Sequence, residues 1–90
     1  MSKFDMMMSQ NPEGQTSQAE IFYQLGQMYA IGREVELDYV EAHKWFNLAA
    51  INGNRRGAFQ RQEMSEMLSK SDVLKAQRLA RDFVQNHTVN

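Results

Sequence analysis

Apolar residues recur along the chain with the spacing of α-helices. The first such stripe follows i, i+3, i+4 and i+7 and consists of Phe22, Leu25, Gly26 and Tyr29. Gly32 follows it and is placed to end the helix as a left-handed cap. We therefore expect a first helix over residues 19–31, with Gln24, Gln27 and Ile31 away from the apolar stripe.

A second helix is predicted to start at Asp38. Asp38 offers an N-cap, and Glu41 lies three residues later, which is the spacing of a capping box. The run Asn52-Gly53-Asn54 is expected to end this helix. Its apolar stripe comprises Ala42, Trp45, Phe46 and Ala49. The small residues of the two stripes, including Gly26, allow close approach of the two helix backbones.

The second half of the chain predicts two more helices. The third covers residues 55–68, and its weaker apolar stripe comprises Ala58, Phe59, Met64, Met67 and Leu68. Ser69 and Asp72 form a second capping box in front of the fourth helix, which is expected to end near Val84. The stripe of the fourth helix comprises Val73, Ala76, Leu79, Ala80 and Phe83.

Both ends of the chain lack this periodicity. Residues 1–18 combine a methionine cluster with a polar stretch that holds Pro12 and Gly14, and we expect them to form a disordered tail. The alternative is a tail that folds onto the domain or onto a second chain, because methionine packs readily into irregular grooves. Residues 85–90 are expected to be a frayed C-terminus.

An internal repeat relates the second and fourth helices. Residues 38–45 and 72–79 both read acidic, apolar, apolar, charged, Ala, polar, basic, large apolar. The offset, 72 − 38 = 34 residues, is the length of one helix–turn–helix unit in a tetratricopeptide-like array.

Residues 19–54 resemble one complete Sel-one-like repeat, a relative of the tetratricopeptide repeat found in bacteria and eukaryotes. The family pattern is met, in order, by Ala19-Glu20, Tyr23, Leu25-Gly26, Met28-Tyr29, Gly32, Val35, Asp38-Tyr39, Ala42, Trp45-Phe46, Ala49-Ala50 and Gly53-Asn54. The resemblance implies an all-α, α-α superhelix over residues 19–84. It would hold two antiparallel helix-turn-helix units with four helices, unit one over 19–54 and unit two over 55–84.

Two departures from the family pattern each lead to a further expectation. The pattern has a second loop glycine where this chain has Glu34 and a proline near Glu36, so we expect a less sharply turned loop. In unit two, Arg61 and Gln62 stand where the pattern has Leu-Gly. Unit two is therefore predicted to be degenerate and to cap the array with a polar outer face.

The charge and composition of the chain argue against several classes of binding partner. The net charge is −1, with three basic and seven acidic side chains in residues 1–50 (net −4) and seven and four in residues 51–90 (net +3). We expect no nucleic-acid partner, because the one basic cluster, Arg55, Arg56 and Arg61, lacks interleaved exposed aromatics. We expect no membrane association, because no run approaches the ~20 apolar residues of a membrane span. The absence of cysteine and of a signal-peptide pattern favours the cytoplasm.

The polar residues do not form a catalytic pattern. His43 and His87 lack a partner at helical spacing, and we expect His43 to be an exposed surface residue. Glu34 and Glu36 lie on a solvated loop, which does not shift carboxyl pKa values as catalysis requires. The aromatic residues at helical spacing are expected to form core rather than a ligand cage. We therefore predict that the chain is not an enzyme and takes no metal or cofactor.

These observations favour a protein–protein interaction module, an adaptor or scaffold that binds a partner peptide or helix in a groove lined by the first helix of each unit. The alternatives are a self-associating structural protein whose homodimer completes the solenoid and, ranked below it, a regulatory subunit of an enzyme. The side chains opposite the core stripes are the predicted partner-binding residues, namely Glu20, Gln24, Gln27 and Ile31 on the first helix and Gln60, Glu63 and Met67 on the third.

Overall fold

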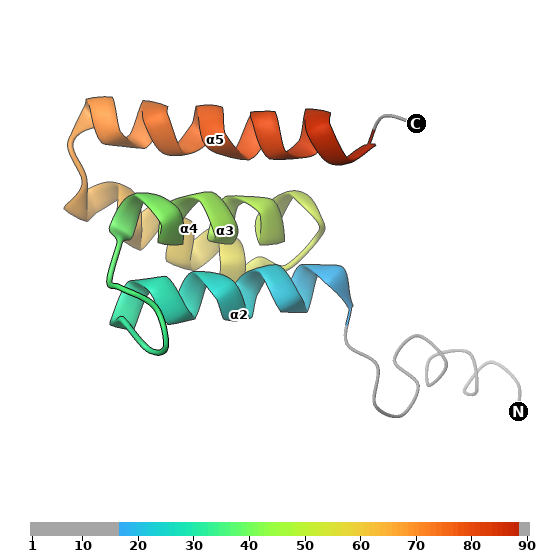
Figure 1. The fold of residues 1–90 in the computed structure, drawn as a ribbon, viewed down its shortest axis with the longest axis horizontal. Coiled ribbons are helices and arrows are strands. Elements are labelled where there is room, and N and C mark those ends of the chain that lie inside the picture. Colours follow the sequence, from blue (N-terminus) through green and yellow to red (C-terminus); the bar gives the residue numbers. More distant parts are fainter. Residues whose placement is uncertain (1–16, 89–90) are drawn as a thin grey trace, which may run out of the picture.

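The structure, a computed structural model, describes residues 17–88 and shows four α-helices without a β-strand among them. The helices are α2 (Gln18–Ile31), α3 (Tyr39–Ile51), α4 (Arg55–Met67) and α5 (Lys70–Thr88). Helix α3 contacts each of the other three. Figure 1 shows α2 and α5 on opposite sides of α3, with α4 behind it. The prediction of an all-α fold with four helices is confirmed.

Helix α2 has caps at both ends. The Ser17 side chain accepts a hydrogen bond from the Glu20 backbone N–H at 3.1 Å, and Gly32, with φ of 72°, ends the helix with its N–H bonded to the Met28 carbonyl. The predicted glycine cap is confirmed. The helix begins one residue before the predicted start at residue 19, so Ser17 and Gln18 belong to the domain rather than to the tail. Residues 1–16 of that predicted tail lie outside the described residues.

The Asp38 N-cap of α3 forms as predicted, although the reciprocal half of the capping box does not. Its Oδ1 accepts from the backbone N–H groups of Val40 and Glu41, at 3.0 and 3.1 Å. The Asp38 backbone N–H donates instead to the Tyr29 carbonyl, at 3.0 Å. The Glu41 carboxylate therefore accepts from Trp45 Nε1, at 3.1 Å, and ties the first turn of the helix to the second.

The loop between α2 and α3 bends through residues 33–35. Glu34 has φ of 67°, in the left-handed region that favours glycine. We expected the absence of a glycine here to leave the loop less sharply turned. Instead the loop bends, and Glu34 adopts the uncommon backbone conformation itself.

The core is centred on α3, which contributes residues from more than one face. Ala42 and Ala49 are 0% exposed, and Phe46 and Leu48 are 1% exposed. Leu48 lies outside the predicted stripe, and it is buried because α3 is covered by three helices rather than one. The other helices add Phe22, Tyr23, Met64 and Ala80 to this cluster.

Two glycines set how closely α3 approaches its neighbours. A Cβ at Gly26 would lie 2.6 Å from the Phe46 ring, so the missing side chain of α2 is replaced by that ring. A Cβ at Gly57 would lie 2.8 Å from Ala49 Cβ and 3.0 Å from the Phe46 carbonyl oxygen. Helix α4 therefore approaches the backbone of α3, with only small side chains between them.

Three aromatic rings, one from each helix, join α2, α3 and α5. The Trp45 ring centroid lies 5.6 Å from Phe22 and 5.3 Å from Phe83, and the two phenylalanine rings meet edge to face at 5.7 Å. Trp45 is half-buried and packs against the core, and Lys44 Nζ lies 4.3 Å from its ring centroid. The predicted core role of these aromatic residues is confirmed.

Helix α4 buries a narrower face than its apolar pattern predicts. Gly57 and Met64 are buried, whereas Phe59 is 62% and Met67 56% exposed. The prediction that Phe59 and Met67 belong to the core stripe is wrong. Helix α4 packs closely on α3 through Gly57, and a residue two positions further along a helix points to a different side.

Helix α5 begins at the predicted capping box, where Ser69 Oγ accepts from the Asp72 backbone N–H at 3.1 Å. It runs to Thr88, so residues 85–88 are helical rather than frayed, and residues 89–90 lie outside the described residues. His87 supports this last turn, with Nδ1 at 2.8 Å from the Phe83 carbonyl oxygen and its ring stacked on Phe83 at 4.1 Å. Among the helices described, none is long and apolar enough to cross a membrane.

Of the residues related by the 34-residue repeat, the two alanines occupy equivalent buried positions, whereas the two acidic residues have different positions in their helices. Ala42 and Ala76 are both 0% exposed. Asp38 is an N-cap, however, whereas its counterpart Asp72 lies inside the first turn of α5.

Replacing Gly57 with alanine is expected to destabilise the fold. The added Cβ meets backbone atoms of α3 that cannot move aside as a side chain can, and such overpacking typically costs about 1–3 kcal/mol. Because the atoms that the Cβ would meet are rigid, we expect the upper part of this range, which exceeds the gain of roughly 1 kcal/mol in helix propensity. Urea unfolding measures the difference, with Gln62→Ala on the exposed side of α4 as the matched control. Equal stability of Gly57→Ala and wild type would contradict the close approach of the two helices.

Replacing Trp45 with alanine is expected to cost about 3 kcal/mol, the lower end of the range for deleting a large core aromatic, because the ring is half-buried. The substitution removes the contacts with Phe22 and Phe83 together. Thermal unfolding followed by circular dichroism measures the loss. An unchanged midpoint would show that the ring does not join the three helices.

Candidate functional site

The seven predicted binding residues lie in two rows on helices α2 and α4. Each row follows i, i+4, i+7 and i+11 along its helix, which places its members on one face. The α2 row is complete as predicted. The α4 row begins with Arg56, which the prediction did not include, and continues through Gln60, Glu63 and Met67.

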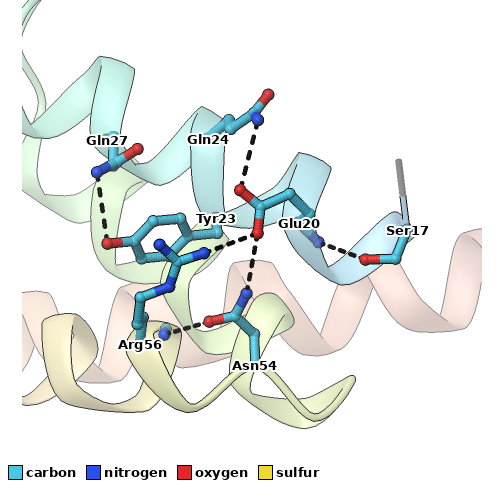
Figure 2. Close-up of polar contacts among 8 residues, drawn as sticks. Ser17, Glu20, Tyr23, Gln24, Gln27, Asn54 and Arg56 are labelled. Atoms are coloured by element: carbon cyan, nitrogen blue, oxygen red, sulfur yellow. Dashed lines mark hydrogen bonds and ion pairs between the residues drawn. The ribbon is translucent and has the colours of Figure 1, made fainter. Parts of the chain in front are cut away.

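The two rows meet at their N-terminal ends, as Figure 2 shows. Arg56 Nη2 lies 3.0 Å from Glu20 Oε1, and the Asn54 side chain donates to the same oxygen at 3.5 Å. Gln24 donates to the other Glu20 oxygen at 3.4 Å. The Glu20 carboxylate therefore links α2 to the start of α4, and its bonding partners come from both rows.

Tyr23 lies beneath this contact. The Arg56 guanidinium carbon is 4.6 Å from the Tyr23 ring centroid, and the Gln27 side chain donates to the Tyr23 hydroxyl at 3.4 Å. Tyr23 is 6% exposed, so it supports both rows from below while its hydroxyl reaches the surface side chain of Gln27.

Further along, the rows separate and leave a pocket of about 220 Å³. Three of the predicted residues, Gln27, Ile31 and Gln60, line it together with Ala30 and Arg33. Ile31 is 62% exposed although it is apolar. The structure thus brings together the C-terminal half of the α2 row and one residue of the α4 row around an open hollow.

The other predicted residues lie outside this pocket. Glu20 and Gln24 belong to the N-terminal contact with Arg56. Glu63 and Met67 lie one and two turns beyond Gln60 on α4, exposed to solvent. Of the residues that the prediction missed, Arg56 could have been found by extending the α4 row back by one turn, whereas Arg33 lies in the loop and no helical pattern indicates it.

His43 is a core residue, which corrects the prediction of an exposed histidine. It is 1% exposed, and its Nε2 lies 3.0 Å from Ser65 Oγ of α4. The Ser65 hydroxyl donates its hydrogen to the Arg61 carbonyl at 3.1 Å. Its oxygen can therefore only accept from His43, so Nε2 is the protonated ring nitrogen and donates its N–H to Ser65. Burial and the charge of Arg61 lower the pKa of His43 below its usual value.

A larger hollow lies elsewhere, on the α5 side of α3. A hollow of about 550 Å³ runs between α3 and α5, and a second of about 200 Å³ opens where both helices end beside the start of α2. Ile51 and Val84 line both hollows, and we call the two together the end groove. In the part of the chain that the structure describes, no three His, Asp or Glu side chains gather to hold a metal ion.

The stability of the protein is expected to fall as the pH drops below about 6.5. The unfolded chain binds a proton at His43 near the ordinary histidine pKa, whereas the folded chain binds it only at lower pH. The unfolded state therefore binds more protons in this range, and acid favours it. Urea unfolding from pH 7.5 to 5.5 tests this, above the range in which carboxylates titrate. His43→Gln should flatten the slope, and an equally steep slope in that variant would exclude His43 as its cause.

Comparison with known protein families, curated proteins and solved structures finds no match to this chain. The resemblance of residues 19–54 to a Sel-one-like repeat stays a prediction from the sequence pattern. The candidate site consequently rests on the geometry of its own residues.

Proposed function

We propose that this chain is a non-enzymatic protein-binding module that takes a peptide or helix of a partner protein between α2 and α4. The observation that carries the proposal is the pocket between these helices, which is lined by an exposed isoleucine and two glutamines. A hollow with an apolar contact and amide groups suits a segment that presents an apolar side chain beside polar backbone.

Each lining residue has a role in this proposal. Ile31 offers the apolar contact, because its side chain is largely in water in the free protein. The amide groups of Gln27 and Gln60 both donate and accept hydrogen bonds, as the backbone of a bound segment requires. The bond from Gln27 to Tyr23 is long, at 3.4 Å, so it is readily exchanged for a bond to a partner.

The contact between Glu20 and Arg56 closes the N-terminal end of the same face. Both groups are partly in water, so their ion pair contributes at most about 1 kcal/mol to stability. Its proposed role is to hold α2 and α4 together at one end and leave the other end open. The bound segment then lies towards Ile31 and Met67, the last residues of their helices.

The proposal extends to the architecture of the family that the sequence resembles. We propose that residues 19–84 form a two-unit Sel-one-like array, with α2 and α3 as unit one and α4 and α5 as the capping unit. The order of the helices and the buried alanines at the 34-residue offset support this assignment.

A peptide display library tests the function across a wide range of candidate segments. The full chain is immobilised, and selected peptides are mapped by chemical-shift changes in ¹⁵N-labelled protein. We expect the largest changes at Gln27, Ile31 and Gln60. Ile31→Asp should weaken binding at least about tenfold, because it places a charge in an apolar contact.

Leu74→Asp is the matched control, because Leu74 is an apolar residue of α5 with 60% exposure, close to that of Ile31. It should bind selected peptides as wild type does. Peptides that bind Ile31→Asp and wild type equally would contradict the proposal. Shifts that change with the concentration of the free protein would instead favour the self-associating alternative.

A further inference from the structure

The start of α2, the end of α3 and the end of α5 gather at one end of the molecule, as Figure 1 shows. The smaller hollow of the end groove opens among them, with Phe22, Leu48 and Phe83 in its lining. These are large apolar side chains that belong to the core or pack against it. The groove therefore exposes one edge of the core cluster at a place where three helices end.

The larger hollow continues this apolar surface along α3 and α5. Ile51, which lines both hollows, is 63% exposed, the highest exposure among the large apolar residues of the described chain. Ala80 and Val84 add apolar lining to the larger hollow, and its polar lining consists of Asn47, Gln77, Arg81 and Gln85. A hollow lined by both apolar and polar groups is suited to a segment of chain that presents both.

We propose that the end groove is occupied by the segment of this same chain over residues 4–8, which contains Phe4, Met6, Met7 and Met8. This segment is the longest cluster of large apolar residues in the sequence before α2. The proposal is independent of the partner site, because the groove shares no residue with the pocket at Ile31 and no residue of α4 lines it.

The point at which the chain enters α2 supports residues 4–8 as the occupant of the end groove. Gln18, the first residue of α2, itself lines the smaller hollow, so the chain enters the domain at the groove. Residues 9–16 can span roughly 25–30 Å when extended. The α5 side of the groove, from Gln77 to His87, is about 15 Å long. The segment therefore reaches every part of the groove, and its tether gives it an effective concentration that a free partner must exceed.

The chemistry of the segment fits the lining. Methionine side chains are flexible and make favourable contacts between sulfur and the edges of aromatic rings, which Phe22 and Phe83 offer here. The segment contains the acidic residue Asp5, and the basic residue Arg81 lines the larger hollow, so the charges of the segment and the groove are complementary. A second copy of the chain could offer the same residues, and the test below separates the two arrangements.

Selective ¹³C labelling of the methionine ε-methyl groups in the full chain tests the proposal. The tail signals are assigned by the conservative variants Met6→Leu, Met7→Leu and Met8→Leu. We expect at least one of these methyl groups to show ring-current shifts and nuclear Overhauser contacts to Phe22 or Phe83. Ile51→Asp should abolish those contacts and accelerate amide exchange over residues 4–8.

Leu74→Asp is again the control, since it adds the same charge at a similarly exposed site of α5. It should preserve the contacts, and circular dichroism should show equal helix content in both variants. Tail methyl signals that coincide with those of free methionine, and that Ile51→Asp leaves unmoved, would overturn the proposal. Contacts seen only between labelled and unlabelled chains, and lost on dilution, would overturn it in favour of exchange between two copies.

Discussion

The structure depends on the close approach of α3 to α2 and α4 around Phe46. The ring of Phe46 fills the space that a side chain at Gly26 would need, and the backbone of the same residue lies against Gly57. One turn of α3 is thereby in near contact with two helices on two sides. Because interiors tolerate neither voids nor overlap, this arrangement fixes the separation of all three helices. The pocket between α2 and α4 exists because both helices are held to α3 in this way, with Glu20 and Arg56 joining them at one end only.

The central place of α3 also explains which parts of the fold could be predicted. Helix positions, the Gly32 cap and the Asp38 N-cap follow from local spacing, and local spacing is visible in the sequence. His43 and Leu48 are buried for a different reason, since they face helices that a single apolar stripe does not reveal. Phe59 shows the opposite error, because an apolar residue on the side of α4 that faces away from α3 stays in water. Burial on a helix depends on how many neighbours cover it, which periodicity alone does not encode.

The candidate sites also combine features that local sequence spacing predicts with features that depend on tertiary packing. The two rows on α2 and α4 were predictable, because residues opposite a core stripe share a face by helical geometry. Their division into a closed end and an open pocket was not, since it depends on the crossing of two helices that are distant in sequence. The smaller hollow of the end groove left no periodic signal, because it forms where three helices begin or end. Ile51 belongs to it only as the last residue of α3 and otherwise has no distinguishing pattern.

Glu34 carries a consequence for how this sequence can vary. A residue other than glycine at φ of 67° lowers the stability of the folded chain by roughly 1 kcal/mol relative to glycine, which adopts this conformation freely. Random mutation at most helix positions lowers stability, whereas glycine or asparagine at position 34 would raise it without altering a core contact. In related chains drifting under selection for folding, this site should therefore favour those two residues. Persistence of glutamate there would mark selection acting on its side chain rather than on the turn.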